Sequence, residues 1–248
     1  MSSENEPELV SATGPDGAGK DTAWKNALPL LPHDLRILKI GKPSSVIING
    51  DERYVDVGMS HRLDWLHSWA DTQRSKTLTS IANTMYVMFQ WRIQEPVWTR
   101  RIHPDLVFSL RDGYVDPAAY APYYTPQTLG KLPIPDRIDT LYRLHHSPFR
   151  HHTIFLDVDP AVAVRRIEER MEREKEAQGL VRPKWVHQHE NLEDLTGIRA
   201  EYGRVLAHMK AVRNTRISTI DTTNQPRETI GLRLAQEILT NLPYVRSG

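Results

Sequence analysis

Two glycines and a lysine near the N-terminus have the spacing of a loop that binds phosphate. In "SATGPDGAGKDTAWK", residues 11–25, Gly14, Gly19 and Lys20 follow the pattern G-x-x-x-x-G-K between an apolar run and a helical run. Glycines are needed because backbone N–H groups close around phosphate oxygens where a Cβ would collide, and the lysine supplies positive charge to the β- and γ-phosphates. The pattern predicts an ATP-binding loop formed by Gly14, Asp16, Gly17, Ala18, Gly19, Lys20, Asp21 and Thr22.

Asp21 occupies the position where such loops normally carry a serine or threonine whose hydroxyl binds magnesium. An aspartate could bind Mg²⁺ directly or through water, or it could point away and leave Thr22 to serve. We therefore expect Mg²⁺ to accompany ATP, with Asp21 and Asp112 as candidate ligands.

Five short apolar runs alternate with longer segments of helical character. This alternation predicts an α/β fold with a parallel sheet covered by helices on both faces. The length of 248 residues suits a single domain, so we expect residues 1–248 to form one. The apolar runs are 8–13, 35–40, 105–110, 152–158 and 216–221, and the helical segments lie near 20–28, 60–102, 160–177, 190–212 and 226–241.

Three segments between these elements have a distinctive composition. The segment 41–59 contains Asn49-Gly50, a dipeptide that favours a tight hairpin turn. The proline-rich segment 121–136 is typical of an ordered surface loop. The segment 172–189 is charged and broken by Gly179 and Pro183, so we expect a mobile excursion from the core there.

The overall composition excludes several classes of function. The net charge is only +1, which gives no general attraction to nucleic acid or to an anionic membrane. The chain has no cysteine, so disulfides and thiolate chemistry are excluded. We expect a cytoplasmic protein, because no apolar run approaches the roughly 20 residues that span a bilayer and the N-terminus, polar and acidic, does not resemble a signal peptide.

Charged residues outside the loop could complete a phosphoryl-transfer site. Asp112 follows the third expected strand, at the sheet edge where ligands bind, and could hold magnesium or accept a proton from the acceptor. Arg111 beside it could bind an acceptor phosphate through two hydrogen bonds; an ion pair at the strand end is the alternative. Arg166 and Arg170 could neutralise the γ-phosphate, although "RRIEERMEREKE" (165–176) is also typical of a solvated helix face.

The chain resembles the thymidylate kinase family of P-loop nucleoside monophosphate kinases. The most specific parts of the resemblance are the loop and the segment around Arg166, and three weaker segments follow the family's order. These stretches are "GPDGAGKDT" (14–22), "LDVDPAVAVRRIEER" (156–170), "MFQWRIQEPV" (88–97), "LTGIRAEYGRVL" (195–206) and "STIDTTNQPRETI" (218–230).

This resemblance implies a three-layer P-loop kinase fold with a five-stranded parallel sheet in the order 2-3-1-4-5 and a mobile lid at about 172–189. It implies transfer of the ATP γ-phosphate to dTMP or a related nucleotide, by a homodimer that pairs through part of segment 60–102. Arg92 would then contact the thymine ring, and Phe89, Arg111 and Tyr120 would belong to the acceptor pocket.

Three departures from the family pattern concern the acceptor side. The third strand ends in "SLRDGYVDPAAY" instead of Asp-Arg-aromatic, Met88 stands where the family often stacks a phenylalanine, and "GKPSS" (41–45) replaces Glu-Pro-Gly. The acceptor could therefore be a nucleoside or another small hydroxylated metabolite. A regulatory nucleotide-binding protein without turnover is a third interpretation, favoured by Asp21 and opposed by the presence of Lys20.

Overall fold

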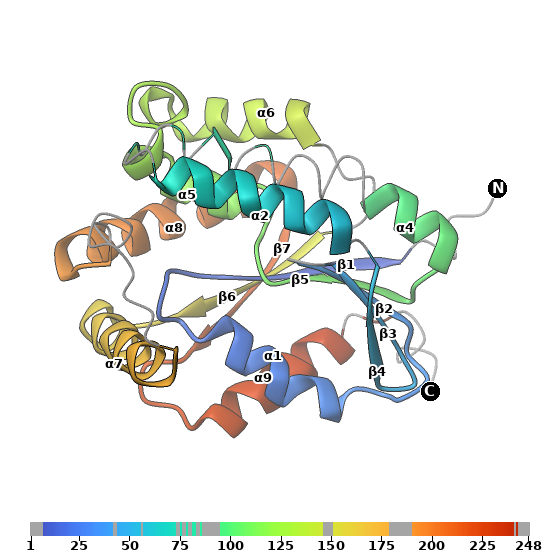
Figure 1. The fold of residues 1–248 in the computed structure, drawn as a ribbon. Helices are drawn as coiled ribbons and strands as arrows, with labels where there is room; N and C mark the ends of the chain where they lie inside the picture. The colour runs from blue at the N-terminus through green and yellow to red at the C-terminus, as the bar shows by residue number, and fades with distance from the viewer. Residues whose placement is uncertain are drawn as a thin grey trace.

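One seven-stranded sheet with helices on both faces forms the part of the chain that the computed structural model describes (Figure 1). Helices α1 (Lys20–Ala27) and α9 (Arg227–Leu239) lie side by side below the sheet in this view. Above it lie α4 (Glu95–Ile102), α5 (Val115–Tyr124), α6 (Ile134–His145) and α8 (Leu192–Arg213). The described residues are 7–41, 44–55, 57–72, 75, 78, 81–82, 85, 95–145, 151–178, 190–240 and 242.

The central five strands are parallel and carry the phosphate loop on the middle one. They lie side by side as β2 (Ile37–Ile40), β5 (Leu106–Ser109), β1 (Glu8–Thr13), β6 (His151–Asp157) and β7 (Arg216–Asp221). The apolar runs form these strands because both faces of the sheet are covered. Trp24 of α1 stacks on Phe108 of β5 with ring centroids 4.0 Å apart, which fixes the helix after the loop against the sheet.

The expected count of five strands was wrong, because a hairpin adds two more at one edge. β3 (Ser45–Ile48) is antiparallel to β2, and β4 (Asp51–Tyr54) is antiparallel to β3. The predicted turn is confirmed: Asn49 and Gly50 have φ values of 53° and 81°, the left-handed pair that a two-residue hairpin needs. The sheet is therefore mixed, and its full order, β4-β3-β2-β5-β1-β6-β7, differs from the expected one by the two hairpin strands. The five parallel strands, numbered among themselves along the chain, do lie in the expected order 2-3-1-4-5.

The expected loop at 121–136 was wrong at both ends, since α5 extends to Tyr124 and α6 begins at Ile134. Pro122 lies inside α5, where it provides no N–H for the carbonyl of Ala118. The Arg137 guanidinium replaces that donor at 3.2 Å and also donates to the carbonyls of Leu132 and Gly130 at 2.8 and 3.0 Å. One buried arginine thus donates hydrogen bonds to the backbone carbonyls around the prolines, up to the start of α6 at Ile134.

Two other expected segments are only partly described. The expected helix 60–102 contains α2 (Val57–Thr72) and α4, and most residues between them, including Phe89 and Arg92, lie outside the described residues. Helix α7 (Pro160–Gln178) continues through the first part of the expected lid, and residues 179–189 are not described. No helix in the described ranges is long and apolar enough to cross a membrane.

Glu95, in the first turn of α4, is an ionisable side chain that is fully buried. Its Oε1 accepts a long hydrogen bond of 3.4 Å from Thr99, and its Oε2 has no hydrogen-bond partner among the described residues. Desolvation therefore raises the pKa of Glu95 to about 7. The folded protein holds this proton over a pH range in which the unfolded chain has already released it.

We predict that stability falls as pH rises from about 4.5 to about 7, and that Glu95→Gln removes part of this loss. At pH 8 the neutral variant should exceed the wild type by up to about 3 kcal/mol in free energy of unfolding, since each pKa unit corresponds to about 1.4 kcal/mol. Urea unfolding at pH 5 and pH 8 measures this, with the exposed Glu168→Gln as the control. An equal effect of Glu95→Gln at both pH values would contradict the prediction.

Candidate active site

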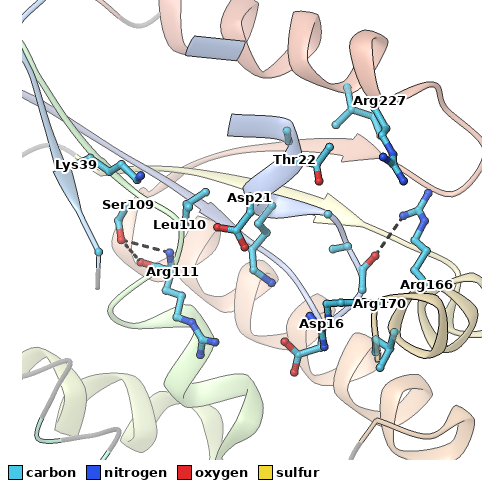
Figure 2. Close-up of a pocket in the computed structure, with 18 of the residues that line it drawn as sticks. Asp16, Asp21, Thr22, Lys39, Ser109, Leu110, Arg111, Arg166, Arg170 and Arg227 are labelled. Atoms are coloured by element: carbon cyan, nitrogen blue, oxygen red, sulfur yellow. Dashed lines mark hydrogen bonds between the residues drawn. The ribbon is translucent and has the colours of Figure 1, made fainter. Parts of the chain in front are cut away.

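A cavity of about 600 Å³ lies along the carboxyl edge of the parallel strands (Figure 2), where ligands bind in open α/β sheets. It extends from the start of α9, past the phosphate loop, to the ends of β5, β2 and β4. Seven cationic and three acidic side chains line it, an excess of four positive charges that suits a polyanionic ligand. These are Lys20, Lys39, Arg111, Arg166, Arg170, Arg173 and Arg227, against Asp16, Asp21 and Glu169.

The loop between β1 and α1 has the backbone conformation that its glycines predict. Gly17 has a φ of 82°, and a Cβ there would lie 2.7 Å from the carbonyl oxygen of Ala163, so no larger residue fits against α7. Gly19 has a φ of 84° directly before α1, and no atom lies within 4 Å of its would-be Cβ. The loop therefore packs closely on the protein at Gly17 and leaves space at Gly19, where the helix N-terminus can meet an anion.

Lys20 is folded into the concave side of this loop. Its Nζ donates to the carbonyls of Gly14 at 2.6 Å and Pro15 at 3.1 Å. Burial lowers the pKa of Lys20, while the carboxylates of Asp16 and Asp116 act in the opposite direction. An anion bound in the loop would compete with these two carbonyls for the ammonium group.

Asp116, which the sequence reading missed, is the buried carboxylate beneath the loop. Its Oδ1 accepts a hydrogen bond of 2.7 Å from the Tyr202 hydroxyl, which also lies 3.1 Å from the Gly14 carbonyl. Its Oδ2 accepts from Thr13 Oγ1 at 2.6 Å and from the backbone N–H of Asp112 at 2.5 Å. One side chain thus connects β1, the start of α5 and α8 directly below the phosphate site.

This carboxylate also balances the charge of the site. Desolvation raises the pKa of Asp116, and the nearby cations Lys20 and Arg111 lower it. Its position in the first turn of α5 could have identified it, but the sequence reading placed no helix there.

Asp112 was predicted to act in catalysis and to bind magnesium, but its surroundings differ from those of the residues that line the cavity. It is 1% exposed and does not line the cavity. Its Oδ1 accepts from the N–H groups of Tyr114 and Val115, both at 2.8 Å, and its Oδ2 accepts from Ser11 and Thr153 at 2.6 and 2.8 Å. These bonds hold the backbone at the start of α5 and join the end of β5 to β1 and β6.

Arg111 and Tyr120 lie on the acceptor side of the loop. Ser109 Oγ donates to the Arg111 carbonyl at 2.7 Å and accepts from the Arg111 N–H at 3.3 Å, so it fixes the turn after β5. The exposed Arg111 side chain then extends into the cavity (Figure 2). The Tyr120 hydroxyl accepts from the backbone N–H of Asp16 and donates to its Oδ2, both at 3.1 Å.

The two predicted arginines of α7 differ in their contacts. Arg166 donates to the carbonyls of Gly17 at 3.3 Å and Thr222 at 2.6 Å, and so ties the phosphate loop to the connection between β7 and α9 (Figure 2). Arg170 pairs with Glu190 at 3.3 Å, and its half-exposed side chain lines the cavity. Arg170 is therefore better placed to reach a phosphate, while Arg166 holds the loop.

Other cavity residues divide between predicted and unexpected ones. Asp21 is exposed and Thr22 half-buried, and both line the cavity as the motif predicts. Three further residues line the cavity but belong to no motif in the sequence: Lys39 of β2, Tyr54 of β4 and Arg227 of α9. Lys39 could have been noticed as a cation near the carboxyl end of an apolar run. The position of Tyr54 at the cavity, by contrast, depends on the pairing of β4 with β3 in the hairpin.

No protein-family model and no curated protein sequence matches this chain. Solved structures with a similar fold include deoxyadenosine kinase from M. mycoides with bound dCTP, with a TM-score of 0.54 and 13% identity. That match covers 94% of this chain and 99% of the other. The chain therefore has the fold of a P-loop kinase.

We predict that Asp116→Asn weakens ATP binding increasingly as pH rises. Without this carboxylate, the pKa of the buried Lys20 falls further, so the ammonium loses its proton at lower pH. Calorimetric titration with ATP between pH 7 and pH 9 should show a growing loss that reaches about tenfold. Tyr202→Phe is the matched control, since it removes a hydrogen bond but leaves the charge. A loss that is the same at every pH, or equal in both variants, would contradict the charge-balancing role.

Proposed function

We propose that this protein is an ATP-dependent phosphotransferase that transfers the γ-phosphate to a nucleoside monophosphate, with dTMP or a related deoxynucleotide as the first candidate. The observation that carries the proposal is the distribution of cations along one cavity. Lys20 in the loop and Arg170 on α7 line the part where the triphosphate would bind, whereas Arg111 follows the neighbouring strand β5 and shares the carboxylates Asp16 and Asp116 with Lys20. A second phosphate group on the acceptor accounts for this separate cation.

The residues of this chain fit Mg²⁺ that arrives with ATP. Mg²⁺ usually keeps several waters and is bound by one or two carboxylates together with substrate phosphates. Asp21 offers an exposed carboxylate in the first turn of α1, and the described residues contain no cluster of three or more acidic or histidine side chains that would form a protein cage. The ion would neutralise charge on the β- and γ-phosphates during transfer.

The transfer itself requires positioning more than proton chemistry. An oxygen of the acceptor phosphate would attack the γ-phosphorus while the bond to the β,γ-bridging oxygen breaks and ADP leaves. The acceptor oxygen is already anionic near neutral pH, so no general base is needed. Arg111 would hold the acceptor phosphate in line, and Lys20 and Arg170 would stabilise the charge that moves with the γ-phosphoryl group.

A nucleoside acceptor is the second candidate, because the solved structure of similar fold is a deoxyadenosine kinase. A neutral hydroxyl would need a general base, and Asp16, a loop carboxylate hydrogen bonded to Tyr120, lines the same cavity as Arg111. With this candidate Arg111 would meet no anion of the ligand and would have only the fixed carboxylates Asp16 and Asp116 near it, so we rank the nucleoside below the monophosphate.

The expected homodimer stays a prediction. Helix α2 exposes Trp65 and Trp69, which are 68% and 44% exposed and lie four residues apart on one helix face. Pairing of two copies through this face would bury both rings.

We predict that Arg111→Ala weakens binding of a monophosphate acceptor by roughly 1.5–3 kcal/mol, the range for a lost hydrogen bond to a charged group. The affinity for ATP should change little. Acceptor KM values for dTMP and thymidine, measured side by side, test this prediction. Arg165→Ala is the control, because Arg165 is exposed on α7 and does not line the cavity.

The same experiment separates the two acceptor classes. A large rise in the dTMP KM with Arg111→Ala supports a monophosphate kinase. If thymidine is the better substrate and Arg111→Ala leaves its KM unchanged, the monophosphate proposal fails and the nucleoside takes its place.

A further inference from the structure

Tyr54, the last residue of β4 in the β3–β4 hairpin, lines the cavity at the edge of the sheet opposite β7. Lys39 of β2 pairs with Ser45 of β3, and Ser45 pairs with Tyr54 of β4, so the three residues form one row across the sheet. Directly paired residues on neighbouring strands project to the same face. The row therefore places an aromatic ring and an ammonium group on the same face at the carboxyl edge, two strands apart with Ser45 between them, and both line the cavity.

Tyr54 is exposed where a folded protein would normally cover such a ring. It is 60% exposed, although it is held in a paired strand next to a cavity. A large exposed aromatic side chain on a concave wall is a typical surface for stacking a planar ligand ring.

Lys39 is held in place by its neighbours. Its Nζ lies 3.0 Å from Glu52 Oε1, and Ser45 Oγ donates to the same oxygen at 2.5 Å. An ammonium group has three donors, and the pair with Glu52 uses one of them. Figure 2 shows the side chain extending from β2 toward the phosphate loop, so the remaining donors can reach an acceptor oxygen in the cavity.

The distance between the two ends of the acceptor side fits a ligand longer than a phosphate group. β5, β2, β3 and β4 are adjacent, so three strand spacings separate the strand that leads to Arg111 from the strand that ends at Tyr54. At 4.7–4.9 Å per spacing this is about 14 Å. Two long side chains that reach inward from these ends leave room for a sugar and a base between them.

We propose that the hairpin forms the base-recognition subsite for the acceptor, in which Tyr54 stacks on the nucleobase and Lys39 donates a hydrogen bond to an oxygen of that base. The inference rests on the proposed function, since it assigns the acceptor of the same site. The acceptor class is then a nucleotide whose base carries a ring carbonyl, such as thymine, uracil or guanine. Adenine has no such oxygen and would gain only the stacking contact.

The test is calorimetric titration with dTMP, dGMP and dAMP, alongside assays of ADP release with the same nucleotides. Tyr54→Leu should weaken the binding of all three by about 5- to 100-fold, the range for loss of one base–aromatic stack. Tyr54→Phe keeps the ring and should retain most of the affinity. Lys39→Met should weaken dTMP and dGMP about tenfold but leave dAMP nearly unchanged.

The control is Arg53→Ala, because Arg53 is exposed on the same strand and projects to the opposite face from Tyr54. If Tyr54→Leu binds all three nucleotides as the wild type does, or Lys39→Met affects dAMP as strongly as dTMP, the subsite is wrong even when turnover is normal. If the wild type binds nucleotides in this Tyr54-dependent way but releases no ADP, the subsite stands and the proposed transfer fails. If no nucleotide binds, both proposals fall.

Discussion

The buried carboxylate of Asp116 is the constraint on which the phosphate site depends. It connects the end of β1, the start of α5 and Tyr202 of α8, and it lies beneath the loop that carries Lys20. Three ordered donors hold a negative charge near two cations, Lys20 and Arg111, that would otherwise repel each other. The rest of the cavity can be strongly cationic because this internal counter-charge is fixed by the fold.

The partners of each guanidinium after folding separate the arginines that hold the protein together from those that can bind a ligand. Arg137 and Arg166 are used mainly on backbone carbonyls, the first at the Pro122 helix and the second between the phosphate loop and the β7–α9 connection. Arg111, by contrast, has its backbone fixed by Ser109 and its guanidinium exposed in the cavity. A count of arginines in the sequence cannot make this distinction, because it depends on which carbonyls lie within reach after folding.

Local signals in the sequence were sufficient for the loop, the five parallel strands and the turn at Asn49-Gly50. The loop and the turn require left-handed backbone, which their glycines supply, and the strands require apolar runs. Helices α5 and α6 were missed because prolines suggested a loop, and the compensating donor for α5, Arg137, lies in α6 further along the chain. Asp116, Lys39 and Tyr54 were missed for a related reason: their roles come from contacts between strands and helices far apart in the sequence.

The proposed activity of the cavity is the transfer of phosphate from ATP to a nucleotide. The most direct measurement is ADP release by the purified protein with Mg²⁺–ATP, with and without each of a panel of nucleoside monophosphates and nucleosides. The account predicts that ADP forms in step with an added monophosphate, with dTMP among the best acceptors, and that Lys20→Ala abolishes this release. ADP release that no monophosphate increases above the acceptor-free background, or that persists in Lys20→Ala, would contradict it.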